Sequence, residues 1–452
     1  MAIEACDHLL QSMSLASVDE LKSQAQRIEQ YALKHGATAF SLSLSVETGF
    51  ELSVREQAVD DILYRQDQSV QMNVYCGQSC GHVSVSSLGQ QDLEHACDKA
   101  LSIAQLLDDD PCQGLPNPKD LAYNFPDLSL YHPWDMDIND AKQMALDLEA
   151  MAREDDRIAM TDSCQISSLS QVHMLMNSHG FFGCYPSSYH EMSLSLLARD
   201  KNSLHSGLEY TMAVNPSALS QPSYLAQRAK ALCLSRLNAR SLPTQQVPVI
   251  FDAPVAVGLV RHFLSAISGG RLYQKQSFLL DQMGEVVFSP IISIEQRPHL
   301  LEGIGSLPFD AEGVQTHQRT LVAAGELQSY LLGTYSARRL GLESTGNASG
   351  AQNVRVMPGE CSQAALIKMM GRGLLVTDVM GQGVNLQNGN YSRGAYGFWV
   401  EHGEIQYPVH EITIASNLKD MFQQIIAIGS DLDMRGSVQA PSMLIEKMTV
   451  AG

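Results

Sequence analysis

The chain has 452 residues, of which 44% are hydrophobic and 17% charged, so it has enough apolar material for packed cores and is not expected to be disordered. Its 30 lysines and arginines against 49 aspartates and glutamates give a net charge of −19, which argues against general binding to nucleic acid or to an anionic membrane, because both need a basic surface. No run of about 18 residues is free of charged and polar interruptions, so no membrane-spanning helix is expected.

The cysteines and the first residues of the chain indicate the cellular compartment in which the protein is expected. Nine cysteines are scattered along the chain, and residues 1–8 contain no basic segment followed by an apolar one. An odd number of cysteines without a secretory leader is typical of reduced thiols in the cytoplasm. The sequence therefore predicts a cytoplasmic protein.

The first predicted unit is a helix, a set of strands and a second helix. The first helix is expected to begin after Ser17, which forms a capping-box pattern with Glu20, and to end near Gly36. Alternating runs then continue to about residue 87, and this period of two predicts an antiparallel meander. The clearest run has hydrophobic residues at every second position: Phe40, Leu42, Leu44 and Val46. A second helix is expected at about 92–107.

The same order of elements returns after a proline-rich connection at residues 111–133. A helix is expected at about 139–153, alternating runs at 158–214 and another helix at 224–240. The two units share no obvious residue identity, so their order leaves open whether they are a structural duplication. Together, residues 1–242 are predicted to form an N-terminal α+β domain.

A buried helix is predicted soon after the next change of pattern, at Pro243. Residues 247–251 predict a short apolar strand, and Asp252 and Pro254 are typical of the start of a helix. This helix should run to about Ser268. It is apolar on most sides, which indicates that it is buried.

The rest of the chain is expected to be mostly strands. Short alternating segments with glycine turns follow to the C-terminus, interrupted by one helical stretch at 417–429. Residues 243–452 are therefore predicted to form a second, mostly antiparallel β domain with a buried helix. The predicted fold class of the whole chain is α+β.

One segment matches two catalytic patterns without the context that either needs. Gly77-Gln78-Ser79-Cys80-Gly81 fits G-x-S-x-G, but a nucleophile elbow needs a helix after it, and an alternating strand pattern follows here. A hairpin turn is the preferred interpretation. Cys76 and Cys80 lie in the same turn, but no second pair of cysteines or histidines is near them in sequence, so a zinc site is not favoured.

Three further motifs lack partner residues. His190-Glu191 and His410-Glu411 each begin an H-E pair, but neither has a second histidine four or five residues later, and both lie in strand-like segments. Gly303-Ile304-Gly305 is followed by Pro308 and no helix, so it is not a dinucleotide loop. Surface or strand-edge positions are the preferred interpretation of both H-E pairs.

His262 is the one candidate metal ligand in the predicted buried helix. A lone histidine in such a helix is more often a hydrogen-bonded core residue than a ligand, because catalytic zinc needs three protein ligands. The next residue is Phe263, and Ala266 and Ile267 stand where a second histidine would be useful. The helix as written cannot supply a zinc site.

Several ordered blocks after residue 243 resemble the PmbA (TldE) branch of the PmbA/TldD family, known also as modulators of DNA gyrase. The length and the two-domain layout agree with the family over nearly the whole chain. The blocks are His262–Gly270 with Tyr273, Lys275, Ser277–Leu279 and Gly284; Tyr335–Gly341 with Ser344–Ala348; and Gly394–Glu401 with Gly403–Ile405 and Tyr407–Val409.

The resemblance implies a cytosolic heterodimer of this chain with a TldD-type subunit, acting as a zinc-dependent peptidase on unfolded or small peptides. In the TldD branch, H-E-x-x-x-H and a C-terminal cysteine bind the zinc. Carried over to this sequence, only the first histidine has a counterpart, His262, because Phe263 and Ile267 replace the other two residues. The last cysteine is Cys361, so the C-terminal segment has no thiol.

We therefore expect this chain to be the non-zinc subunit, with no catalytic residue and no metal of its own, and with zinc in the TldD-type partner. Peptide substrates could pair with an exposed strand edge. Three alternatives stay open: a self-sufficient hydrolase with an unseen site, a regulatory protein that acts on DNA gyrase without peptidase chemistry, and a homodimeric scaffold. No membrane and no direct nucleic acid partner is expected.

Overall fold

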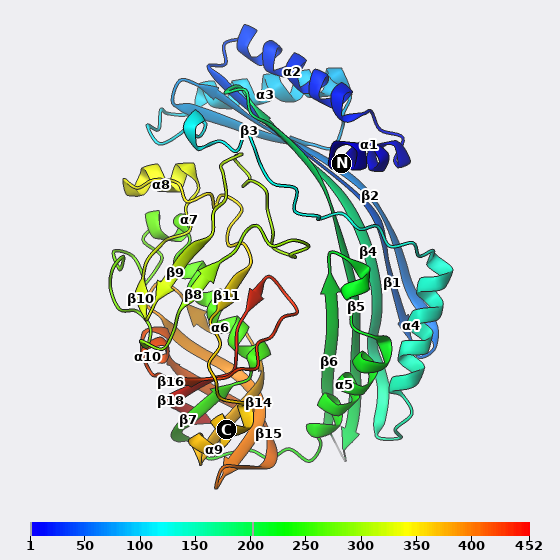
Figure 1. Cartoon of the computed structure of the whole chain (residues 1–452), viewed down its shortest axis with the longest axis vertical. Coiled ribbons are helices and arrows are strands. Elements are labelled where there is room, and N and C mark those ends of the chain that lie inside the picture. Colours follow the sequence, from blue (N-terminus) through cyan, green and yellow to red (C-terminus); the bar gives the residue numbers. More distant parts are fainter. Residues whose placement is uncertain (1, 201–202) are drawn as a thin grey trace.

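The N-terminal half of the chain forms one long, curved sheet (Figure 1). The computed structural model describes residues 2–200 and 203–452. Within these, six strands pair in the order β3-β2-β1-β4-β5-β6, and every neighbouring pair is antiparallel. The strands are β1 (Ala39–Arg55), β2 (Ala58–Cys76), β3 (Ser79–Val85), β4 (Ile158–Asn177), β5 (Phe182–Asp200) and β6 (Ser203–Ala213).

Helices cover one face of this sheet in two groups. The first group is α1 (Ala2–Ser12), α2 (Val18–Lys34) and α3 (Gln90–Leu106); the second is α4 (Ile138–Ala152) and α5 (Pro222–Ser235), and short turns η1 (Pro118–Asp120) and η2 (Pro216–Ala218) lie in loops. In the first group, α2 and α3 pack over one end of β1 and over β2 and β3, and α1 packs over β4 and β5. The second group packs over β5, β6, β4 and the other end of β1.

The topology supports the duplication that the sequence left open. Apart from α1 at the start of the first unit, each unit runs helix, three strands, helix. The first strands of the two units, β1 and β4, pair with each other at the centre of the sheet. The second unit thus repeats the first in mirror order across that pair. The predicted helices agree with α2, α3, α4 and α5 to within a few residues, except that α5 ends at Ser235 instead of residue 240.

The C-terminal half lies against the other, concave face of the long sheet (Figure 1). It has two further sheets in the described residues, one of seven strands and one of five. The seven are β7 (Gln245–Phe251), β12 (Gly373–Met380), β13 (Val384–Asn385), β14 (Asn390–Glu401), β15 (Glu404–Asn417), β16 (Ile425–Ile428) and β18 (Met443–Ala451); the five are β8 (Ile294–Gln296), β9 (Arg319–Ala323), β10 (Glu326–Leu327), β11 (Val354–Val356) and β17 (Val438–Gln439).

Helix α6 (Ala253–Ala266) is central to the core of this half. Asp252 caps it by accepting a hydrogen bond from the Ala253 amide at 2.8 Å. Phe263 is fully buried and meets Phe288 edge-on at 5.0 Å between ring centroids. The prediction of a largely buried helix after a short apolar strand is confirmed.

Two sequence expectations for the helices are corrected. The stretch 417–429 is not one helix: α10 (Leu418–Gln423) ends early, and β16 follows because Ile425, Ala427 and Ile428 pair with β18. In addition, helix α1 was not expected, and neither were three short C-terminal helices, each too short to show a clear hydrophobic period. These are α7 (Gly269–Tyr273), α8 (Thr334–Leu340) and α9 (Gln363–Met370).

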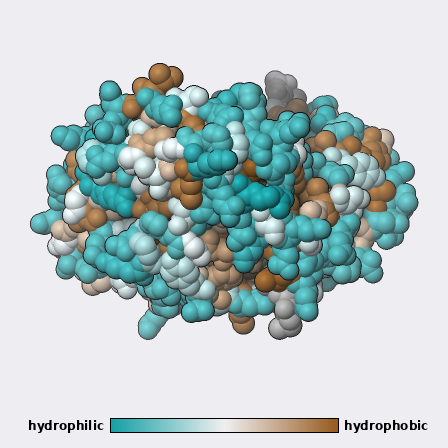
Figure 2. Space-filling view, turned by 90° about the horizontal axis from the view of Figure 1, so that it is seen from above, coloured by the Kyte–Doolittle hydropathy of each residue, from teal (hydrophilic) through white to brown (hydrophobic). Residues whose placement is uncertain are grey.

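None of the helices in the described ranges combines the length and the apolar composition that a bilayer crossing needs. Viewed from the end that carries α2 and α3, the surface is largely hydrophilic, with smaller hydrophobic patches interrupted by polar residues (Figure 2). Scattered apolar residues of this kind are ordinary on folded proteins.

A buried carboxylate on α4 fixes the turn between β1 and β2. The turn residues Glu56 and Gln57 both have positive φ, at 53° and 60°, the geometry of a two-residue hairpin that usually favours Asn-Gly. Glu149 is fully buried, and its two carboxylate oxygens accept hydrogen bonds from the Glu56 amide at 2.8 Å and the Gln57 amide at 2.7 Å. This side chain therefore links the second unit to a strained turn of the first.

We predict that Glu149→Ala destabilises the N-terminal half by about 3 kcal/mol, because it leaves two turn amides without their charged acceptor. Hydrogen exchange of the segment around Glu56 and Gln57 should accelerate, and the urea midpoint should fall. Glu154→Ala removes an exposed acid just beyond the same helix and is the matched control. Equal exchange rates in the two variants would contradict the prediction.

Candidate functional site

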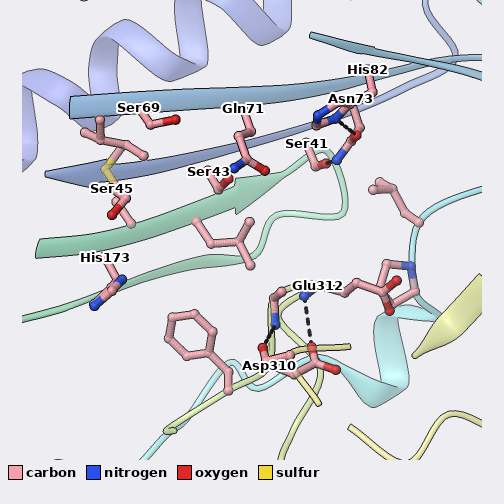
Figure 3. A pocket seen from close by; sticks show the side chains of 18 of the residues that line it. Ser41, Ser43, Ser45, Ser69, Gln71, Asn73, His82, His173, Asp310 and Glu312 are labelled. Carbon is pink, nitrogen blue, oxygen red and sulfur yellow. Dashed lines mark hydrogen bonds between the residues drawn. The ribbon is translucent and has the colours of Figure 1, made fainter. Parts of the chain in front are cut away.

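A cavity of about 680 Å³ lies between the concave face of the long sheet and the C-terminal half. Figure 3 shows side chains from β1 and β2 above it and the segment around Asp310 and Glu312 below it. The proline-rich connection closes one side with residues Gln113–Pro116. The cavity is therefore built from three parts of the chain that are far apart in sequence.

The sheet wall of the cavity carries hydroxyl and amide groups. The alternation of β1 sends its apolar side chains to the helices and its serines to the cavity, and β2 adds polar residues beside them. These polar residues are Ser41, Ser43, Ser45, Ser69, Gln71 and Asn73. Asn73 Nδ2 donates to Ser41 Oγ at 3.1 Å, and Asn73 Oδ1 lies 2.8 Å from His82 Nδ1. Neutral groups of this kind can hydrogen-bond to a peptide main chain.

His173 is a partly buried histidine on this wall. Its Nε2 lies 3.0 Å from Ser187 Oγ, and its ring stacks on Tyr185 at 4.9 Å. Burial lowers the pKa of His173 to about 4, because the charged imidazolium would lose its hydration. The imidazole is therefore neutral at pH 7 and can act as a hydrogen-bond donor or acceptor.

The opposite wall is acidic. Asp310 is buried, and its Oδ1 accepts hydrogen bonds from the Glu312 and Val314 amides, both at 2.9 Å, while its Oδ2 accepts one from the Ala348 amide at 3.0 Å. Burial, assisted by the nearby Glu312, raises the pKa of Asp310 to about 6. Glu312 Oε2 accepts a hydrogen bond from the Thr334 amide at 2.8 Å. Asp310 thus shapes a tight turn and can change charge near neutral pH.

None of the cavity residues on β1 and β2 was predicted from the sequence. The signal was present in the serines that alternate with Phe40, Leu42 and Leu44, but a polar strand face most often lies against water. Only the contact between residues near 41–82 and residues near 307–349 makes that face the wall of a cavity.

The G-x-S-x-G segment is a hairpin turn, as predicted. Gly77 and Gln78 connect β2 to β3, and Cys76 pairs with Ser79. Ser79 Oγ is buried and donates to backbone carbonyls, with Ala104 O at 2.6 Å and Cys76 O at 3.0 Å. This hydroxyl has a structural role. The Cys80 side chain reaches the cavity, and burial raises the pKa of its thiol.

Both H-E pairs lie in strands, as expected, but the surface or strand-edge position expected for His190 is wrong, because β5 has β4 on one side and β6 on the other. His190 of β5 is buried, its Nε2 lies 2.8 Å from His132 O, and its ring packs edge-on against Trp134. Glu191 points the other way and accepts a hydrogen bond from Tyr189 at 2.6 Å. His410 lies in β15. The Gly303–Gly305 segment is a loop that packs against Asn353, whose Oδ1 accepts from the Gly305 amide.

His262 lies in the last turns of α6 but is not fully buried, which corrects the expectation of a core histidine. It is half-buried and opens onto a separate hollow, with Tyr391 of β14 edge-on at 6.1 Å. Burial and the charge of Arg393 together lower the pKa of His262. Phe263 and Ile267 turn into the apolar core instead.

The surroundings of His262 do not fit zinc. The nearby charged groups are the guanidinium groups of Arg271 and Arg393, which repel a cation. Cys361 belongs to a different apolar cluster, where its carbonyl accepts a hydrogen bond from the Ser430 amide. Across the described residues, no three His, Cys, Asp or Glu side chains lie close enough to hold one ion.

Comparisons with known proteins now identify the family. The PmbA/TldA metallopeptidase central domain matches residues 131–237, and the C-terminal domain of the same family matches residues 244–452. The "Metalloprotease PmbA homolog" of Haemophilus influenzae is 42% identical over 96% of this chain and 98% of its own length. The chain belongs to the PmbA/TldD family. "Metalloprotease PmbA" of Escherichia coli O157:H7 is 40% identical, over 91% and 92% of the two chains.

The identities place the chain in the PmbA branch. The "Metalloprotease TldD homolog" of Haemophilus influenzae is only 24% identical, over 68% of this chain and 70% of its own length. Among solved structures, a putative modulator of DNA gyrase from Bacteroides thetaiotaomicron matches with a TM-score of 0.91 and 25% identity over 96% and 99% of the chains. TldE from Thermococcus kodakarensis shares the fold, with a TM-score of 0.78, 21% identity and coverage of 95% and 100%. The predicted family and α+β fold class are confirmed.

We predict opposite pH effects from the two shifted groups in the cavity. A group with a lowered pKa, such as His173, costs stability as pH falls from 6.5 to about 4, because only the unfolded chain takes up its proton. Asp310, with a raised pKa, costs stability as pH rises from about 4 to about 6. His173→Gln should therefore reduce the loss of stability on acidification to pH 4 by about 2 to 3 kcal/mol.

The measurement is urea denaturation of wild type and variant at pH 7 and pH 4, with His95→Gln, an exposed histidine on α3, as the matched control. Nuclear magnetic resonance should also find the His173 ring neutral at pH 5. A protonated His173 at that pH would show the prediction to be wrong.

Proposed function

We propose that this chain is the TldE-type subunit of a cytoplasmic peptidase, and that a TldD-type subunit supplies the zinc ion and the catalytic base. The observation that carries the proposal is the α6 helix, where His262 stands beside Arg393 while Phe263 and Ile267 pack into the core. A catalytic zinc ion needs three protein ligands and an open position, and this helix provides one imidazole. Relatives at 40–42% identity nevertheless carry the name metalloprotease.

The polar cavity gives this subunit a role in holding substrate. Its hydroxyl and amide groups can satisfy the donors and acceptors of an extended peptide without selecting particular side chains. Its volume of about 680 Å³ suits a few residues of a small or unfolded peptide, and not a folded protein.

A free strand edge offers a second kind of contact. Among the described residues, β3 pairs only with Val70–Cys76 of β2, so the stretch Ala58–Ser69 has β1 on one side and no strand on the other. Ile62, Leu63 and Tyr64 on this stretch are exposed. Such an edge can add a strand from a peptide or from a partner subunit.

Co-expression with the TldD-type protein of the same organism tests the proposal. We predict that the pair cleaves an unfolded model peptide such as reduced casein fragments, and that each chain alone is at least about a hundredfold slower, because chamber and metal are divided between them. Metal analysis should find about one zinc ion per pair, and His262→Ala should leave that content unchanged.

Two results would overturn the proposal. The first is zinc bound in a one-to-one ratio by this chain alone and removed by His262→Ala. The second is peptide cleavage by this chain alone at the rate of the pair, which would favour a self-sufficient hydrolase. Co-purification with DNA gyrase in place of a TldD-type protein would instead favour a regulatory role.

A further inference from the structure

The hollow beside His262 is electropositive in a strongly acidic protein. It measures about 400 Å³ and lies between the end of α6, helix α7 and the β13–β14 hairpin. Arg271 and Arg393 line it, and its lining contains no aspartate or glutamate. The chain as a whole has 49 acidic and 30 basic residues. The lining of this hollow is therefore positively charged, whereas the chain as a whole is negatively charged.

Both arginines keep donors available for a ligand. Arg271 Nε donates to Ser265 Oγ at 3.1 Å, which orients the guanidinium group. Its two terminal nitrogens then remain available to donate to a ligand. Arg393 makes only long bonds, from Nε to Met380 O at 3.4 Å and from Nη2 to Val379 O at 3.5 Å. Within residues 2–200 and 203–452, neither arginine forms an ion pair with a carboxylate.

The remaining lining completes a site for a small organic anion. The imidazole of His262 and the amide of Gln382 add neutral hydrogen-bonding groups. Val384 and Leu386 add an apolar wall beside the charges. A simple inorganic anion would gain nothing from contact with an apolar wall. A carboxylate attached to an apolar group can bind the arginines through its charge and the wall through its apolar group.

We propose that this hollow binds the free C-terminal carboxylate of a short peptide, with Arg271 and Arg393 as its charge partners and Val384 and Leu386 in contact with the last side chain. Guanidinium groups match the planar carboxylate and bind it through paired hydrogen bonds. The choice of a peptide as the source of the carboxylate rests on the proposed function.

Calorimetric titration of the full-length chain tests the proposal with four probes. These are N-acetyl-Ala-Leu, its C-terminal amide, N-acetyl-Asp-amide and inorganic phosphate. We predict that N-acetyl-Ala-Leu binds at least about tenfold more tightly than each of the other three, because only it combines an α-carboxylate with an apolar last side chain. Equal binding of the amide, or tighter binding of the side-chain carboxylate or of phosphate, would overturn the proposal.

Variants locate the binding. Arg271→Gln and Arg393→Gln should each weaken binding of N-acetyl-Ala-Leu by about tenfold or more. Arg27→Gln removes the same charge from an exposed position on α2 and should leave the affinity within about twofold. Arg271 is itself exposed, so its variant should fold even if Arg393→Gln does not. Unchanged affinity in Arg271→Gln would contradict the assignment.

The result is separable from the test of the proposed function. If the pair cleaves peptides but the free carboxylate does not bind this chain, the hollow is assigned wrongly and the peptidase role stands. If the carboxylate binds but the pair cleaves nothing, the anion site stands and the peptidase role is wrong.

Discussion

The alternation of side chains along β1 determines which residues form the core under the helices and which residues line the cavity against the C-terminal half. Even-numbered residues such as Leu42 and Leu44 pack under the helices, and odd-numbered residues such as Ser41 and Ser43 face the C-terminal half. A shift of one residue in this register would bury the serines under the helices and place leucines in the cavity. The register of β1 therefore determines both the polar lining of the cavity and the apolar core under the helices.

The proline-rich connection joins the halves by main-chain contacts. The Ala122 amide donates to Gly313 O, and the Gln315 amide donates to Asp120 O, both at 2.9 Å. Helix α8 holds the beginning of the connection, because Arg338 donates to the carbonyl oxygens of Cys112, Gly114 and Leu115. The sequence block Tyr335–Gly341 therefore has a positional role at the cavity rim.

Patterns among neighbouring residues predicted the repeated units. The cavity was not predicted, because the residues that line it are far apart in the sequence. The capping box of Ser17 and Glu20 and the period of two after Phe40 appear in the structure as expected, because both depend on neighbouring residues. Helix α1 was missed although Cys6, Leu9, Leu10 and Met13 have helical spacing. The segment at 417–429 misled because a short apolar run fits a helix or a strand equally well. The wall of the cavity could not be predicted, since it depends on Asp310 meeting strands β1 and β2, which lie more than 200 residues earlier in the sequence.

The mirrored arrangement of the two units makes the folding of each unit depend on the other. β1 and β4 share the centre of the sheet, so each unit made alone would present a long strand of unpaired amides and carbonyls to solvent. The strand that pairs with this edge of the first unit, Ile158–Asn177, follows that unit in the sequence, so the edge has no partner in a chain that ends before it. Isolated halves of the sheet should therefore self-associate, and the natural partner for either one is the other.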